Sequence, residues 1–223
     1  MRILAVDTSS ERGSVCVVDS GEVLGEIRLA SSIQHSDRLF RSIGFLLEYL
    51  PFQLSDVDVF AAALGPGSFT GLRVGLAAIE GFAAAHCSRG AGVTTLEALA
   101  WKTKIRDALI APTIDARRGE VYGALYRRTG DTLVEEHPAV VLKPAEWFAC
   151  LPGQPLILCG DGAVRYRSVI EERPEWRIHS MHLYLASTIA ELVATPNCRP
   201  LKPLYVRKTD AEIARESIAS PNS

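Results

Sequence analysis

The chain has 223 residues, of which 48% are hydrophobic and 22% charged, with 24 Lys and Arg against 26 Asp and Glu. A chain of this length can fold around its own core without disulfides or a structural metal, and a net charge of −2 argues against a free-standing nucleic-acid binder. The longest apolar run, residues 59–64, is far shorter than the roughly 20 residues that span a bilayer, and no signal-peptide core follows Met1. We therefore expect a cytoplasmic protein with no membrane partner and with reduced cysteines.

The first half of the chain predicts three strands, a helix, a strand and a second helix. Glycine turns separate the first three β-like runs, a pattern typical of an antiparallel meander. Apolar residues at helical spacing then end at Pro51, and a continuous apolar run indicates a fully buried strand. The expected strands are residues 2–8, 14–19, 22–29 and 57–64, and the expected helices are residues 33–50 and 69–87.

The helix expected over residues 69–87 is unusual because it is apolar or small on nearly every side. Arg73 and Glu80 are its only charged residues before His86. A helix of this composition is buried on more than one side. We therefore expect a second cover besides its own sheet, with the small residues Gly71, Gly75 and Ala78 allowing another helix to approach closely.

The second half repeats the first half weakly. Asp7 and Asp115 each close a buried strand and precede a glycine turn, and residues 155–159 again form a buried strand that ends in a glycine turn. We predict an α/β protein with two βββαβα lobes, residues 1–104 and 105–208, and a polar tail over residues 209–223 that is disordered or a frayed helix. Two such lobes are the arrangement of the actin-like ATPase (ASKHA, ribonuclease H-like) fold, whose cleft holds a nucleotide. Asp7 and Asp115 then either approach phosphates or serve as turn residues, a position that Asp favours.

Patterns for other chemistry are incomplete. The glycine-rich residues 65–71 lack the lysine and the following Ser or Thr of a phosphate loop, so we interpret these glycines as close-packing positions. His179 and His182 lack a third metal ligand nearby. The basic residues 199–208 favour a segment that crosses between lobes over an RNA contact. The sequence predicts no catalytic, cofactor-binding or metal-binding residues.

Five motifs in order resemble the TsaB family of bacterial tRNA threonylcarbamoyladenosine biosynthesis. They are ILAVDTSS at residues 3–10, GPGSFTGLRVGL at 65–76, IDARRGEVY at 114–122, CGDG at 159–162 and KPLYVR at 202–207. The resemblance implies a non-catalytic homologue of TsaD, which transfers a threonylcarbamoyl group to N6 of adenosine in tRNA (t6A). TsaD binds its metal partly through an H-x-x-x-H motif, and at that place this chain has Thr95 and Leu99, which are poor metal ligands.

The resemblance also implies partners. TsaD is expected to form a heterodimer with the chain, TsaE to join the pair, and the chain to form a homodimer when alone, with tRNA contacted only through the complex. We expect that this chain requires no cofactor, and the resemblance leaves open a nucleotide at the interface of the complex. The hypothesis places the partner interface on the two helices of the first half, at His35, Leu39, Ser42, Gly71, Arg73, Gly75, Ala78 and Phe82. The alternative is an independently active nucleotide-dependent enzyme or peptidase of the actin-like superfamily, in which Asp7 and Asp115 hold Mg²⁺-nucleotide.

Overall fold

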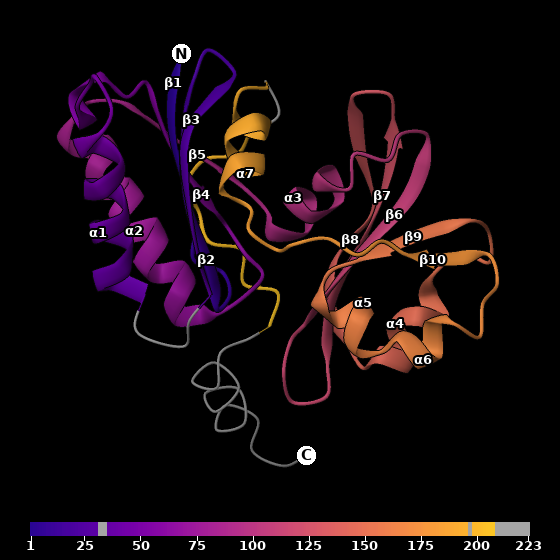
Figure 1. Ribbon diagram of the computed structural model, residues 1–223. Helices are drawn as coiled ribbons and strands as arrows, with labels where there is room; N and C mark the ends of the chain where they lie inside the picture. Colours follow the sequence, from indigo (N-terminus) through magenta and orange to yellow (C-terminus); the bar gives the residue numbers. More distant parts are fainter. Residues whose placement is uncertain (31–34, 196–197, 208–223) are drawn as a thin grey trace, which may run out of the picture.

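The computed structural model describes residues 1–30, 35–195 and 198–207, and it contains two mixed sheets side by side (Figure 1). The first sheet has the strand order β3-β2-β1-β4-β5 and the second has the order β10-β9-β6-β7-β8. The expected α/β class and the two lobes are confirmed. The strands of the first sheet are β1 (Arg2–Asp7), β2 (Arg12–Asp19), β3 (Glu22–Ala30), β4 (Val59–Ala63) and β5 (Arg89–Val93), and those of the second are β6 (Ala108–Asp115), β7 (Val121–Thr129), β8 (Thr132–Leu142), β9 (Leu156–Cys159) and β10 (Trp176–Ile178).

The first lobe follows the predicted order of elements. β1 pairs antiparallel with β2 and parallel with β4, so the meander continues into a parallel half. All five residues of β4 are buried, because helices cover both faces of this part of the sheet. On one face lie α1 (His35–Glu48) and α2 (Phe69–Ala85), on the side away from the second lobe (Figure 1). A short 3₁₀ helix, Leu54–Asp56, precedes β4.

The second lobe repeats this connectivity, as the weak duplication predicts. β6 pairs antiparallel with β7 and parallel with β9, as β1 does with β2 and β4. The helices of its outer face are short: α4 (Pro144–Cys150), α5 (Asp161–Arg165) and α6 (Arg167–Ile170).

Two helices between the sheets each pack on the sheet that the other half of the sequence forms. α3 (Thr95–Lys102) packs on β6 and β7 of the second sheet, whereas α7 (Ala186–Val193) packs on β1 and β2 of the first. One hydrophobic cluster runs through both, from Ile3 and Leu96 to Ile110 and Ile189. The predicted boundary at residue 104 therefore divides the two sheets in sequence. It does not divide the helices that pack on them, because α7, which follows the second sheet in the chain, packs on the first sheet.

The segment after α7 joins the lobes. Arg199 forms an isolated antiparallel bridge with Gly92 of β5, and Arg207 donates to the carbonyl oxygen of Ala116 in the second lobe at 3.0 Å. The predicted crossing by the basic segment is confirmed over the described residues, and the predicted tail, 209–223, lies outside them. No helix in the described ranges is long and apolar enough to cross a membrane.

Candidate functional site

Five of the eight residues predicted to contact a partner are buried inside the chain. Leu39 and Ser42 point from α1 into the core, and Gly71, Gly75 and Ala78 lie on the buried side of α2. The predicted interface is corrected at these positions. Arg73 is exposed and Phe82 is partly buried, while the side chain of His35 lies outside the described part of the structure.

The small residues of α2 are required by the chain's own turn between β1 and β2. A Cβ atom at Gly71 would lie 2.0 Å from the carbonyl oxygen of Thr8, and one at Gly75 would lie 2.3 Å from the Thr8 hydroxyl oxygen. The Thr8 hydroxyl in turn donates to the carbonyl oxygen of Gly71 at 2.7 Å. The close-packing interpretation of the glycines is thus confirmed, and the stripe is no seam for another subunit.

A different set of residues on the same two helices is open to solvent. We call it the outer helix face, and on it Phe40 is 52% exposed while added Cβ atoms at Gly44 and Gly81 would meet nothing within 4 Å. The Phe40 ring meets Phe82 edge-on, with 6.0 Å between centroids, and so ties α1 to α2. The outer helix face consists of Phe40 and Gly44 of α1 and Ala77, Gly81 and Ala84 of α2. Apolar periodicity points to the opposite, more apolar stripe of each helix, which faces the core, so the predicted interface does not include these five residues.

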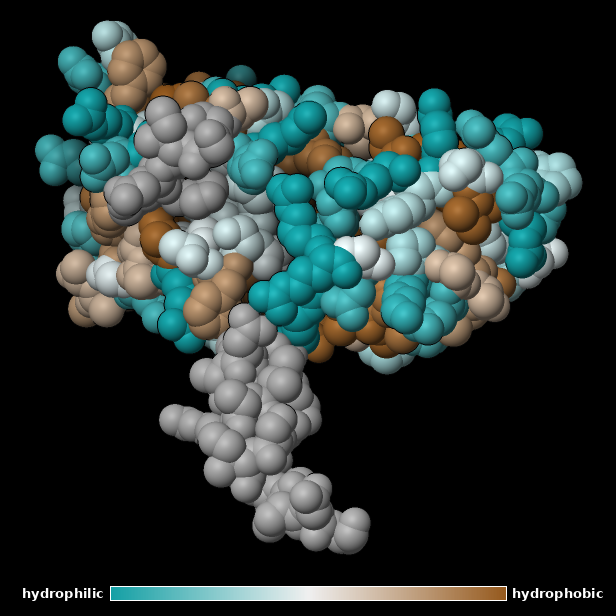
Figure 2. All heavy atoms as spheres, turned by 90° about the horizontal axis from the view of Figure 1, so that it is seen from below, coloured by the Kyte–Doolittle hydropathy of each residue, from teal (hydrophilic) through white to brown (hydrophobic). Residues whose placement is uncertain are grey.

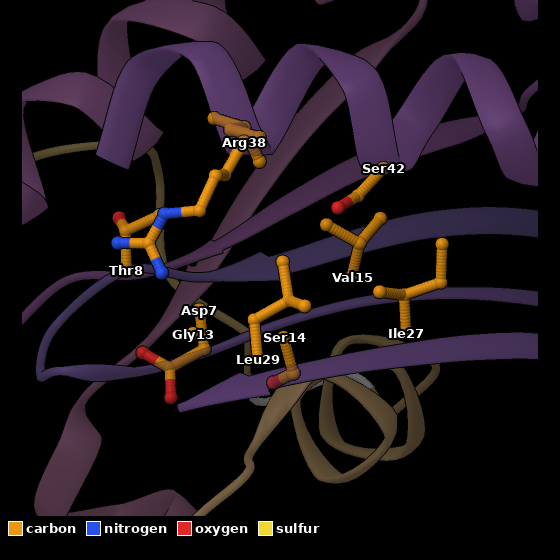
Figure 3. A pocket seen from close by; sticks show the side chains of 10 residues that line it. Asp7, Thr8, Gly13, Ser14, Val15, Ile27, Leu29, Arg38 and Ser42 are labelled. Carbon is orange, nitrogen blue, oxygen red and sulfur yellow. The ribbon is translucent and has the colours of Figure 1, made fainter. Parts of the chain in front are cut away.

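Asp7 is wholly buried at the end of β1. Its Oδ1 accepts from the Ser9 hydroxyl at 2.6 Å and from the Ser9 amide at 2.9 Å, whereas its Oδ2 accepts no hydrogen bond from the described residues. Burial raises the pKa of Asp7 to about 6, although the Ser9 bonds and the Leu185 amide at the start of α7 oppose the rise. Figure 3 shows the carboxylate directed away from α1 and Arg38.

This environment fits a structural role for Asp7 at the junction with α7. The neighbouring Ser14 of β2 accepts from the Ala186 amide, in the first turn of α7, at 3.0 Å. The cavity lined by Asp7 and Arg38 in Figure 3 has a volume of about 20 Å³, which holds about one water molecule. A magnesium ion with a phosphate does not fit there.

Asp115, the counterpart of Asp7, is engaged with arginines. Its Oδ2 lies 3.2 Å from Arg165 and 3.9 Å from Arg117, and its amide donates to the Asp161 carboxylate at 3.0 Å. Its carboxylate charge is therefore balanced within the chain.

An open cleft of about 1090 Å³ lies between the lobes. The turn after β1, the start of α2, the turn between β6 and β7 and residues 204–207 line it. The Glu11 carboxylate and the Arg117 guanidinium meet across it at 3.2 Å. Figure 2, which looks at the molecule from below, shows hydrophilic residues gathered at the junction of the lobes. The arginines that line the cleft are Arg12, Arg117, Arg118 and Arg207.

Thr95 and Leu99, which the resemblance sets at the positions of the two TsaD histidines, lie on α3, and both are buried. Within the described ranges, no group of three or more His, Cys, Asp or Glu side chains could hold a metal ion. His179 and His182 belong to no such group.

Comparison with known proteins gives a consistent picture. The model of the family described as "TsaD: tRNA N6-adenosine threonylcarbamoyltransferase" matches residues 25–171. The TsaB protein of Bacillus subtilis is 30% identical over 174 residues, which cover 77% of this chain and 76% of the relative, and that of Escherichia coli is 36% identical over 148 residues, 65% of this chain and 63% of the relative. The structure of YeaZ from Pseudomonas aeruginosa matches with a TM-score of 0.77 and 26% identity over 92% of this chain and 100% of that one. The fold is the two-lobed actin-like architecture, and the chain belongs to the TsaB family of tRNA threonylcarbamoyladenosine biosynthesis proteins.

Proposed function

We propose that this chain serves t6A formation as a non-catalytic subunit that binds TsaD through the outer helix face. Relatives named as tRNA threonylcarbamoyladenosine biosynthesis proteins support the role in this modification. TsaD carries out the transfer itself, and the chain holds TsaD in its productive conformation by contacts that are stronger in that state than in others.

The observation that carries the proposal is the outer helix face itself. It joins an exposed phenylalanine, Phe40, to small residues such as Gly81 that leave open space above the helix backbone. Exposed apolar residues on adjacent helices are typical of protein interfaces, and small residues allow a partner helix to come close. The second lobe lies on the other side of the first sheet from α1 and α2 (Figure 1).

A non-catalytic role is supported by the surroundings of the candidate reactive residues. Asp7 is sealed in the core and Asp115 is paired with Arg165. Leu99 stands where a metal-binding histidine would be needed, and its side chain has no ligand atom. An independent nucleotide-dependent enzyme would need both carboxylates open to the cleft and a metal ligand in place of Leu99.

The further partners follow from the same surface. A second copy of the chain uses the outer helix face when TsaD is absent, and TsaE joins once the pair has formed. The chain works in the cytoplasm, where the tRNA that the complex modifies is found. It requires no cofactor of its own.

Co-purification with tagged TsaD tests the interface. We expect Gly81→Arg to abolish recovery of the chain, because the arginine projects from the centre of the outer helix face. Gly153→Arg is the matched control, since Gly153 is also exposed with open space above it but lies in the second lobe. Equal recovery of Gly81→Arg and Gly153→Arg would place the interface elsewhere.

Two activity measurements separate the subunit from the enzyme. Reconstituted t6A synthesis should require this chain and should fail with Gly81→Arg while TsaD remains intact. Calorimetry of the isolated chain with Mg-ATP should show no binding that depends on Asp7. Binding that disappears in Asp7→Ala, or t6A synthesis without the chain, would refute the proposed role.

A further inference from the structure

We propose that the interlobe cleft binds a single-stranded segment of RNA, with a phosphate on Arg12 and one base against the ring pair Phe69–Tyr205. The inference rests on the proposed function, which makes tRNA the substrate of the complex. It assigns a direct RNA contact to a surface that the outer helix face leaves free.

The cleft offers one arginine that the fold does not consume. Of the four arginines that line it, Arg117 pairs with Glu11 and Arg207 with Glu120, and Arg118 also has a partner within the chain. Arg12 is exposed, and its guanidinium has neither an ion pair nor a hydrogen bond within the described part of the chain. An unpaired arginine beside others on a concave surface is suited to phosphate oxygens.

Beside these arginines lies a fixed aromatic platform. Phe69 is 40% exposed and Tyr205 is 43% exposed, with 5.4 Å between their ring centroids. Arg73 holds the two rings together, because its guanidinium lies 3.9 Å from the centroid of Phe69 and its Nε donates to the Tyr205 hydroxyl at 3.3 Å. Exposed rings next to a basic groove are how proteins hold single-stranded nucleic acid without reading its sequence.

The same structure argues against a phosphate at the start of α2. The Ser68 amide donates to the carbonyl oxygen of Ser9 at 2.7 Å, and the Gly71 amide donates to the Ser68 hydroxyl at 3.2 Å. These amides are therefore unavailable to a phosphate. Arg12 and the ring pair line an open cleft, which suits a strand that passes through it. A duplex hides the faces of its bases and cannot use the ring pair.

Fluorescence anisotropy of the full chain with a labelled single-stranded RNA of about 10 nucleotides, within the length that a single-strand-binding domain covers, tests the inference. We expect saturable binding that Tyr205→Ala weakens about fivefold or more. Arg12→Gln should weaken it as well and should reduce the slope of log affinity against log salt by about 0.7. Arg177→Gln, which removes an exposed arginine from β10 far from the cleft, is the matched control and should change neither quantity. Thermal melting verifies that every variant folds.

Three results would overturn the inference: no saturable binding, equal binding by Arg12→Gln and Arg177→Gln, or equal competition by ATP or by double-stranded RNA. Co-purification of Arg12→Gln with TsaD tests the proposed function separately from RNA binding. If this variant pairs with TsaD and the unmodified chain does not bind RNA, the inference fails while the proposed function stands. If RNA binds in the cleft and Gly81→Arg still pairs with TsaD, the proposed interface fails instead.

Discussion

At the scale of single residues, the surroundings of Asp7 decide which role its carboxylate has. Its sequence position fits both a phosphate-facing residue and a turn residue. Complete burial and the two hydrogen bonds from Ser9 favour the structural role, and the burial also makes stability depend on pH in an unusual direction.

Asp7 should lower the free energy of unfolding as pH rises through weakly acidic values. Its pKa is raised from 3.8 to about 6, so between these values the folded protein keeps a proton that the unfolded chain has released. The stabilisation is full below pH 3.8 and is lost as pH rises through about 6, and the loss amounts to about 3 kcal/mol. Urea unfolding of Asp7→Asn against the unmodified chain from pH 4 to pH 7 measures it, because the amide cannot ionise. Parallel pH profiles for the two proteins would contradict the burial of an ionisable carboxyl.

At the scale of elements, the two glycines of α2 separate packing from binding. Gly75→Ala forces a Cβ atom to within 2.3 Å of the Thr8 hydroxyl oxygen, whereas Gly81→Ala places one in open space. We expect Gly75→Ala to destabilise the chain by about 1–3 kcal/mol through overpacking and Gly81→Ala to stabilise it by roughly 0.5–1 kcal/mol. Thermal unfolding of the two variants measures this difference in stability, since both make the same chemical change in the same helix. Similar shifts in melting temperature would mean that Thr8 moves aside freely.

The same helix shows what the sequence could predict and what it could not. Apolar periodicity predicted the start of α2 at Phe69 and the burial of its small residues, because burial depends on local spacing. The neighbour of Gly75 could not be predicted, since Thr8 is distant in sequence and reaches α2 only through the pairing of β1 with β4. For that reason the sequence could not show that the predicted interface residues of α2 pack against the chain's own turn. The open space above Gly81 could not be predicted either, because amino-acid composition does not report it.

At the scale of the whole molecule, the exchange of α3 and α7 makes the two lobes interdependent. The sequence predicted the repeat because each half has the same order of strands. It did not predict the exchange, because either sheet offers an apolar face to an apolar helix. Each lobe now depends on a helix from the other half of the chain, and the shared cluster includes Leu99 of α3 and Ile189 of α7.

Truncating one of these helices should therefore weaken both lobes at once. Ile189 is fully buried, and Ile189→Ala should lower the free energy of unfolding by about 2–5 kcal/mol. Amide exchange should show faster opening of β1 and of β6 together, because loss of α7 packing loosens the cluster that α3 shares with the second sheet. Phe45→Ala is the control, since Phe45 is 54% exposed on α1 and lies outside the shared cluster. If only the first sheet lost protection in Ile189→Ala, the lobes would be independent domains, and a partner seated on α1 and α2 could not influence the cleft through the core.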